Sequence, residues 1–122
     1  MMREDDDHSR VLFHLRAQYW DSLPTKAYRV RRLIRKERKG GLELGEREEL
    51  ELAVRRLAES GACYGFEEIS DIAVQMVDLL DRRRDGDETS RELEVWCDEL
   101  DRYIDDMTVE ALAVGLKSIW RD

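Results

Sequence analysis

The stretch RRLAESGACYGF, residues Arg55–Phe66, combines a helical pattern with a glycine near its end. Leu57 continues, at helical spacing, an apolar pattern that starts upstream at Leu50. Residues three or four positions apart share one face of an α-helix, so the pattern predicts a helix from about Glu46 to a turn at Gly65. The inner face of this helix is expected to hold Leu50, Ala53, Val54, Leu57 and Gly61. Its outer face would hold Leu52, Arg55, Arg56 and Glu59.

Apolar residues recur at helical spacing through the rest of the chain, and no segment shows the alternation typical of a β-strand. The sequence therefore predicts an all-α fold. The other expected helices cover about 9–21, 24–40, 66–83, 89–106 and a short segment over 108–119. The inward face of the first is expected to hold Leu12, Leu15, Tyr19 and Trp20.

Capping residues and helix breakers set the expected boundaries. Asp21 or Ser22 is expected to cap the second helix, with Pro24 in its first turn, where a missing N–H group is tolerated. The pair Gly40 and Gly41 is expected to end that helix. The last two helices are expected to begin at further capping residues: Thr89 with Glu92, and Thr108.

The four middle helices are each four or five turns long and are joined by short loops. We therefore expect antiparallel neighbours in an up-down four-helix bundle. An extra N-terminal helix and a short C-terminal helix would pack on its ends or flanks. At 122 residues the chain is expected to be one domain, 1–122, in which residues 1–8 form a flexible acidic tail.

The chain carries 21 basic and 29 acidic residues, a formal net charge of −8 at pH 7, so a nucleic-acid-binding protein is not expected. The N-terminal residues MMREDDDHSR lack the apolar run of a signal peptide. No segment approaches the roughly 20 apolar residues of a membrane helix. We expect a cytoplasmic protein with no membrane partner, and we expect Cys63 and Cys97 to be buried and unpaired.

Arg55–Phe66 also resembles the signature of the histidine-containing phosphotransfer (HPt) domain, which in many members runs H-x-L-[K/A]-G-S-A, three further residues, G-F. The segments DSLPTK (21–26) and FEEISDIAVQMVDLL (66–80) are similar to the family as well, and the resemblance covers about Tyr19–Met107. It implies a four-helix bundle whose central helix presents a histidine that carries a phosphoryl group between receiver domains. The positions that match the signature are Leu57, Ala58, Ser60, Gly65 and Phe66.

Two residues depart from that signature. Arg55 stands at the position of the histidine, and its side chain is protonated at pH 7 and is not a nucleophile, which excludes phosphotransfer there. Glu59 stands where the family has a glycine, one turn along the same face, and its carboxylate would meet a receiver pocket that is itself acidic. Arg55 would be attracted to such a pocket and Glu59 repelled, unless the two side chains pair with each other.

The resemblance therefore implies a pseudo-phosphotransfer protein that binds a receiver domain or a histidine kinase and regulates a phosphorelay without carrying phosphate. No enzymatic activity, cofactor or metal is expected, and a homodimer is left open. The predicted partner-binding residues are Leu52, Arg55, Arg56, Glu59 and Ser60.

A second candidate surface lies in KAYRVRRLIRKERK, Lys26–Lys39, which is strongly basic. Three interpretations remain open: a solvated face neutralised by acidic helices, a docking surface for an acidic protein, or a nucleic-acid contact. The alternative function is that of a helical scaffold or regulatory subunit that binds an acidic protein partner through this helix. The outer positions of the segment are Arg29, Arg32, Arg35, Lys36 and Lys39.

The two histidines of the chain, His8 and His14, lie away from the central helix. Their spacing matches no metal-ligand pattern. A surface or half-buried histidine is expected at both positions, and a phosphate-accepting role for His14 is the remaining alternative.

Overall fold

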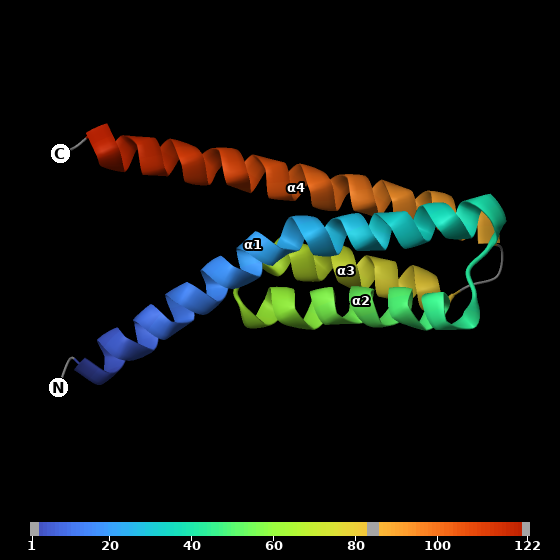
Figure 1. Cartoon of the computed structure of the whole chain (residues 1–122), viewed down its shortest axis with the longest axis horizontal. Coiled ribbons are helices and arrows are strands. Elements are labelled where there is room, and N and C mark those ends of the chain that lie inside the picture. The colour runs from blue at the N-terminus through green and yellow to red at the C-terminus, as the bar shows by residue number, and fades with distance from the viewer. Residues whose placement is uncertain (1–2, 83–85, 121–122) are drawn as a thin grey trace.

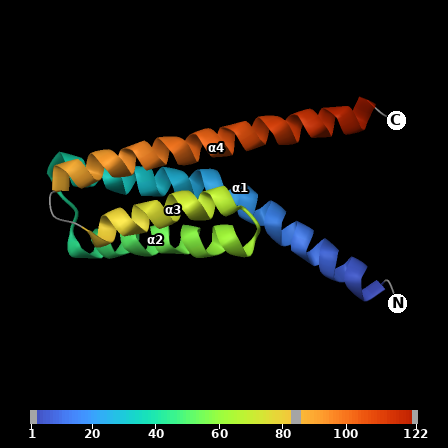
Figure 2. The same cartoon turned by 180° about the vertical axis from the view of Figure 1, so that it is seen from behind.

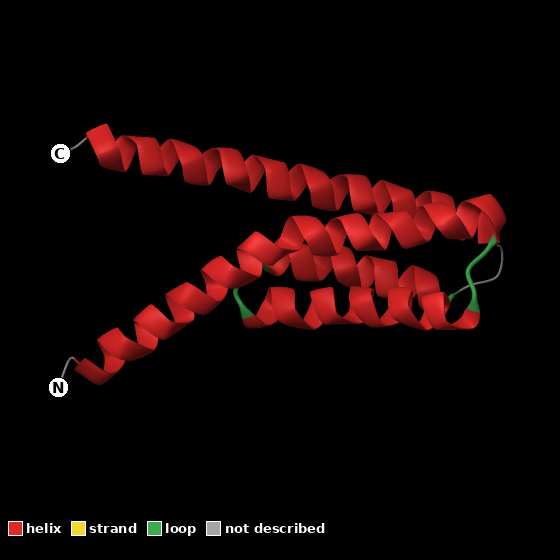
Figure 3. Cartoon of the chain, in the orientation of Figure 1, coloured by secondary structure: helices red, strands yellow, loops and turns green. Residues whose placement is uncertain are grey.

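The computed structural model describes residues 3–82 and 86–120, and within these ranges the chain forms four helices and no strand. This confirms the predicted all-α fold. Loops join α1 to α2 and α2 to α3 (Figure 3). The helices are α1 (Arg3–Gly40), α2 (Leu44–Cys63), α3 (Glu67–Asp81) and α4 (Gly86–Trp120).

The chain reverses direction between consecutive helices, so that the four helices lie side by side over part of their length (Figure 1). α1 contacts α2 and α4, and α3 contacts the same two helices. The start of α1 and the end of α4 extend beyond α2 and α3 on the same side of the molecule and diverge from each other (Figures 1 and 2). Surfaces built from several helices are therefore confined to the four-helix part.

α1 is one helix across the position at which the sequence predicted a boundary, so the predicted cap at residues 21–22 is wrong. Pro24 lies inside the helix. A proline in a helix interior removes one N–H donor and bends the helix, and α1 changes direction about half-way along its length (Figure 1). The buried stripe continues across the bend, with Tyr19 and Leu23 before the proline and Ala27 after it. This packing explains why the helix bends instead of ending.

α4 is likewise one helix where two were predicted. Thr108 does not cap a separate C-terminal helix, because its Oγ1 donates a hydrogen bond of 2.7 Å to the carbonyl oxygen of Ile104. A threonine that bonds back by four residues lies in a helix interior. The predicted start at Thr89 is also wrong, because α4 begins at Gly86. The predicted extra helices at the two ends are therefore parts of α1 and α4.

The acidic tail predicted over residues 1–8 overlaps the first helix. α1 begins at Arg3, so residues 3–8 belong to the helix instead of preceding it. Residues 1–2 lie outside the described part of the chain.

One hydrophobic core fills the four-helix part. On α2 the predicted inner residues are buried, except Ala53, which is partly buried. The inner face deduced from helical spacing is thereby confirmed. The buried apolar side chains are Tyr19, Leu23, Ala27, Val30, Leu33, Ile34, Leu42, Leu50, Val54, Leu57, Ile69, Ile72, Ala73, Met76, Leu80, Leu93, Cys97, Leu100 and Ile104.

Four residues near the start of α1 were predicted to face the core, and this prediction is wrong for Leu12 and Leu15. Leu12 and Leu15 are 48% and 42% exposed, whereas Tyr19 is buried and Trp20 is partly buried. All four share the helical spacing, but the early part of α1 extends beyond α2 and α3 (Figure 1). Periodicity identifies the apolar face of a helix and does not show how far its neighbours reach.

Charged side chains tie α1 to α4 in addition to the core. Arg31 Nη2 donates to Asp98 Oδ1 at 2.7 Å and to Asp101 Oδ2 at 2.6 Å.

The two cysteines differ in burial. Burial raises the pKa of the Cys97 thiol to about 12, and the positive charge of the neighbouring Arg31 opposes part of that rise. Cys97 is buried and unpaired as predicted, whereas Cys63 is exposed, which corrects the prediction for that residue.

Two leucines on α2 test the assigned inner face. Leu50 is fully buried, and Leu52 is 49% exposed. We expect Leu50→Ala to lower the free energy of unfolding by about 2–5 kcal/mol, because removing a buried leucine side chain leaves a cavity. The matched control, Leu52→Ala, should change it by less than about 1 kcal/mol. Urea unfolding followed by circular dichroism measures both, and equal losses would contradict the inner face.

Candidate functional site

The end of α2 is built around two glycines. Gly61 has no room for a side chain, because a Cβ atom there would lie 2.9 Å from the backbone nitrogen of Ser70 on α3. Ser70 Oγ also donates to the carbonyl oxygen of Ala58 at 2.7 Å. Gly65 adopts a φ of +83°, a left-handed conformation that favours glycine, in the turn that leads to Phe66. These contacts hold α3 close against α2.

An aromatic cluster joins α1 to this turn. The Tyr19 ring stacks on Tyr64 and Phe66, with centroids 4.8 Å and 5.8 Å away. Trp20 lies 5.4 Å from the Phe66 ring, and the Arg16 guanidinium lies 5.2 Å from the same ring. Such contacts contribute beyond the burial of apolar area. The cluster therefore anchors α1 to the end of α2.

A hydrogen bond of 2.8 Å joins the hydroxyl groups of Tyr19 on α1 and Ser60 on α2. The Ser60 hydroxyl is also bonded to the carbonyl oxygen of Arg56 at 2.5 Å. Burial raises the pKa of Tyr19 above its ordinary value, and the hydrogen bond with Ser60 opposes part of that rise. Ser60 is therefore a link between two helices and not a free surface hydroxyl.

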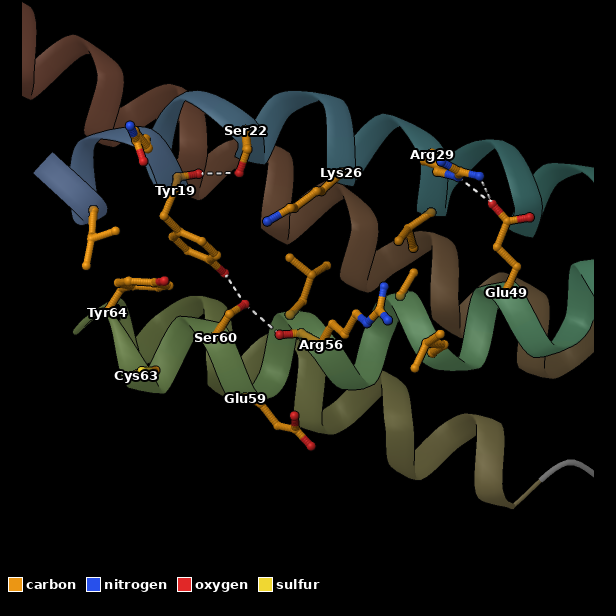
Figure 4. Close-up of a pocket in the computed structure, with 16 residues that line it drawn as sticks. Tyr19, Ser22, Lys26, Arg29, Glu49, Arg56, Glu59, Ser60, Cys63 and Tyr64 are labelled. Atoms are coloured by element: carbon orange, nitrogen blue, oxygen red, sulfur yellow. Dashed lines mark hydrogen bonds and ion pairs between the residues drawn. The ribbon is translucent and has the colours of Figure 1, made fainter.

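A groove of about 800 Å³ lies between α1 and α2 (Figure 4). Its base is apolar, with Val30 from α1 and Ala53 and Leu57 from α2. Two half-exposed leucines, Leu15 and Leu52, lie on opposite walls. Four of the five predicted partner-binding residues line this groove: Leu52, Arg56, Glu59 and Ser60.

The charges of the groove are unevenly paired. Arg29 of α1 forms an ion pair with Glu49 of α2. Lys26 Nζ lies 4.7 Å from the centroid of the Tyr19 ring, and the Arg56 side chain extends from α2 toward α1 (Figure 4). Within the described part of the chain, neither Lys26 nor Arg56 forms an ion pair.

Arg55 lies outside the groove and faces α3. It forms an ion pair of 2.9 Å with Asp81. The pair between Arg55 and Glu59 that their spacing permits is not formed, and the Glu59 carboxylate points away from α1 (Figure 4). The structure therefore separates Arg55 from the other four predicted residues, although all five lie on α2.

The predicted basic face is part of the C-terminal half of α1, and its members fall into two groups. Arg29 and Lys36 pair with α2, through Glu49 and Glu46 respectively, the second pair at 2.6 Å. The rest are exposed and form no ion pair with residues that the structure describes: Arg32, Arg35 and Lys39.

The α1 wall of the groove was not predicted from the sequence. Tyr19 was expected in the core, which is confirmed, but its hydroxyl contact with Ser60 joins residues 41 positions apart. Lys26 lay within the basic segment but was not among its predicted outer residues. The available signal was a tyrosine in an apolar stripe, since a buried tyrosine usually bonds through its hydroxyl.

The remaining sequence candidates were the two histidines. His14 is exposed on α1, and the side chain of His8 lies outside the part of the chain whose side chains the structure describes. No group of three or more His, Cys, Asp or Glu side chains that could hold a metal ion occurs among the described residues.

Across 3–82 and 86–120, no helical segment combines the length and the apolar character that a membrane span requires.

No family model matches the chain, and no match is found among curated proteins or solved structures. The resemblance to the HPt signature therefore stays a prediction. The functional argument rests on the residues of the groove and their geometry.

The variant Tyr19→Phe tests the link between α1 and α2. At neutral pH we expect it to lower the free energy of unfolding by about 1 kcal/mol, because one hydrogen bond is lost and the ring is kept. A raised pKa means that the folded state favours the neutral hydroxyl, so the wild type loses stability as the pH rises above about 10 and through the folded-state pKa. The variant lacks this titration. The stability gap between the two proteins should therefore shrink or reverse at alkaline pH.

Chemical denaturation at a series of pH values measures that gap. The matched control is Tyr28→Phe, because Tyr28 is exposed and forms no contact with Ser60. A gap for Tyr19→Phe that is absent at neutral pH, or that grows at alkaline pH, would contradict the assigned link.

Proposed function

We propose that the chain is a non-catalytic HPt-like protein that regulates two-component signalling by binding a receiver domain or a histidine kinase without carrying phosphate. In this proposal the four helices form an antiparallel up-down bundle of the HPt type, and α2 is its central helix. The carrying observation is the half-exposed Arg55, paired with Asp81, at the position that holds the phosphorylated histidine in the motif.

The chemistry of that position is inconsistent with phosphate transfer. A guanidinium group is protonated at neutral pH and cannot accept a phosphoryl group as a neutral imidazole can. The contact with Asp81 also reduces the attraction of Arg55 for an acidic receiver pocket, because its charge already faces a carboxylate. Attraction to a receiver would therefore depend more on Arg56, which forms no ion pair with the described residues.

The groove supplies the other part of a binding face. Leu52 offers an exposed apolar anchor, and Arg56 and Ser60 lie beside it on α2. A protein that occupied a receiver through such a face would compete with phosphate exchange or hold the receiver in an assembly. Either outcome would be regulatory.

A single substitution tests this face. We expect Glu59→Gly to tighten binding to a receiver domain at least several-fold, because the substitution removes a carboxylate that would oppose the acidic receiver pocket. Glu48→Gly is the matched control: it makes the same change on α2 at an exposed residue that does not line the groove. Fluorescence anisotropy with each purified receiver and kinase domain of the source organism measures the affinities. Equal effects of the two substitutions, or no binding to any of these domains, would contradict the proposal.

A second candidate function is supported by the unpaired cations of α1. The chain would then be a scaffold or regulatory subunit that docks an acidic protein on Arg32, Arg35 and Lys39, which are exposed. Unpaired charges of one sign mainly speed encounter and select partners.

Charge reversal separates the two candidates. We expect Arg32→Glu with Arg35→Glu to reduce capture of a co-purifying acidic partner at least tenfold if this basic face is used, and to leave receiver binding unchanged. The control pair, Arg91→Glu with Arg102→Glu on α4, changes the net charge by the same amount. Quantitative pull-down with mass spectrometry measures capture, and equal losses for the two pairs would show only an effect of net charge.

A further inference from the structure

We infer that the groove between α1 and α2 accepts an amphipathic helix of a partner protein, one that carries acidic side chains beside its apolar stripe. The inference names the chemistry of the partner at the face of the proposed function and rests on that face being a binding surface. It does not require the partner to be a receiver domain.

The dimensions of the groove favour a helix. The residues of α2 that line it run from Glu49 to Cys63, and at 1.5 Å per residue this corresponds to about 21 Å, or about four helical turns. The groove lies along the surface between two helices that run in opposite directions (Figures 1 and 4). A partner helix can lie along such a groove and contact both walls over its whole length.

The apolar residues of the groove suit such a helix. Leu15 on α1 and Leu52 on α2 remain 42% and 49% exposed, one on each wall. The base of the groove includes Val30 and Leu57, which are already buried in the core. A partner helix that inserts apolar side chains would cover both leucines without opening the core.

The charges of the groove select the sign of the partner. The Glu49 carboxylate is occupied by Arg29, and the Glu59 carboxylate points away from α1 (Figure 4). Lys26 and Arg56, one from each wall, form no ion pair with the described residues. The groove therefore presents an excess of positive charge on a chain whose net charge is −8. Acidic side chains on a partner helix would complement it.

The serine hydroxyls of the groove contribute little to this selection, because their hydrogen bonds are made within the chain. The Ser60 hydroxyl is bonded to Tyr19 and to the Arg56 carbonyl oxygen. Ser22 Oγ donates to the Tyr19 carbonyl oxygen at 2.6 Å. The cation–π contact with Tyr19 also holds Lys26 in place before a partner binds. Lys26 and Arg56 are thus the cations of the groove that can recognise acidic side chains of a partner.

A peptide selection tests the inference. The probe is a display library of helix-forming peptides of about 18 residues, or five turns, with randomised positions, selected against the full chain. We expect the selected peptides to place apolar residues at i, i+3 or i+4, and i+7, with an excess of Asp and Glu beside that stripe. A synthesised representative should bind at least tenfold more weakly to Lys26→Glu with Arg56→Glu, and its affinity for the wild type should fall as salt is added.

Matched variants keep the test informative. Arg91→Glu with Arg102→Glu gives the same change in net charge away from the groove and should bind the peptide as the wild type does. Lys26→Gln with Arg56→Gln is measured in parallel, because it removes both charges without introducing repulsion if the reversed variant unfolds. Selected peptides without an acidic excess, affinity unchanged by both groove variants, or a failure to select helical peptides would each overturn the inference.

Three further outcomes identify another occupant or separate the two proposals. Light scattering gives the molar mass of the wild type and the groove variants, and a dimer that only the groove variants lose would assign the groove to a second copy and overturn the inference. Peptide binding without receiver or kinase binding would reject the proposed function and keep this inference. Receiver binding that responds to Glu59→Gly, without any acidic helix selected, would do the reverse.

Discussion

The packing of α1 against both of its neighbours is the constraint on which the other features depend. One buried stripe, which includes Leu23, Val30 and Ile34, places α1 between α2 and α4. Because the stripe continues across Pro24, the helix bends there and remains one element. The same helix supplies one wall of the groove and, through Arg31, the charged contact with α4. The groove exists because the position of α1 is determined by the core beneath it.

Helical spacing was sufficient to predict the fold class and the inner face of α2, because Leu50, Val54, Leu57 and Gly61 are all covered by neighbouring helices. It was not sufficient at the ends of the long helices. Leu12 and Leu15 have the spacing of core residues but remain 48% and 42% exposed, and Leu15 lines the groove instead of the core. The helix boundaries predicted near Pro24 and at Thr108 were wrong for a related reason. Capping signals are local in sequence, whereas the packing that overrides them involves distant residues.

The α2 side of the candidate site could be predicted, because its residues are close in sequence and share one helix. The α1 side depends on the register between two helices, which no local pattern contains. Tyr19 meets Ser60 across 41 positions, and Arg55 meets Asp81 across 26. The second contact bears on the proposed binding face. It moves Arg55 away from the groove and leaves Arg56 as the α2 cation that faces α1.

The two cysteines differ in their chemistry because one lies in the core and the other on the surface. Thiolates, not thiols, react with electrophiles, and a pKa of about 12 keeps Cys97 almost entirely protonated at neutral pH while the protein is folded. Cys63, which is exposed, is open to reagents at once. Modification of Cys97 would have to wait until α4 separates from α1. The delay between the labelling of Cys63 and the labelling of Cys97 therefore reports how often α4 separates from α1.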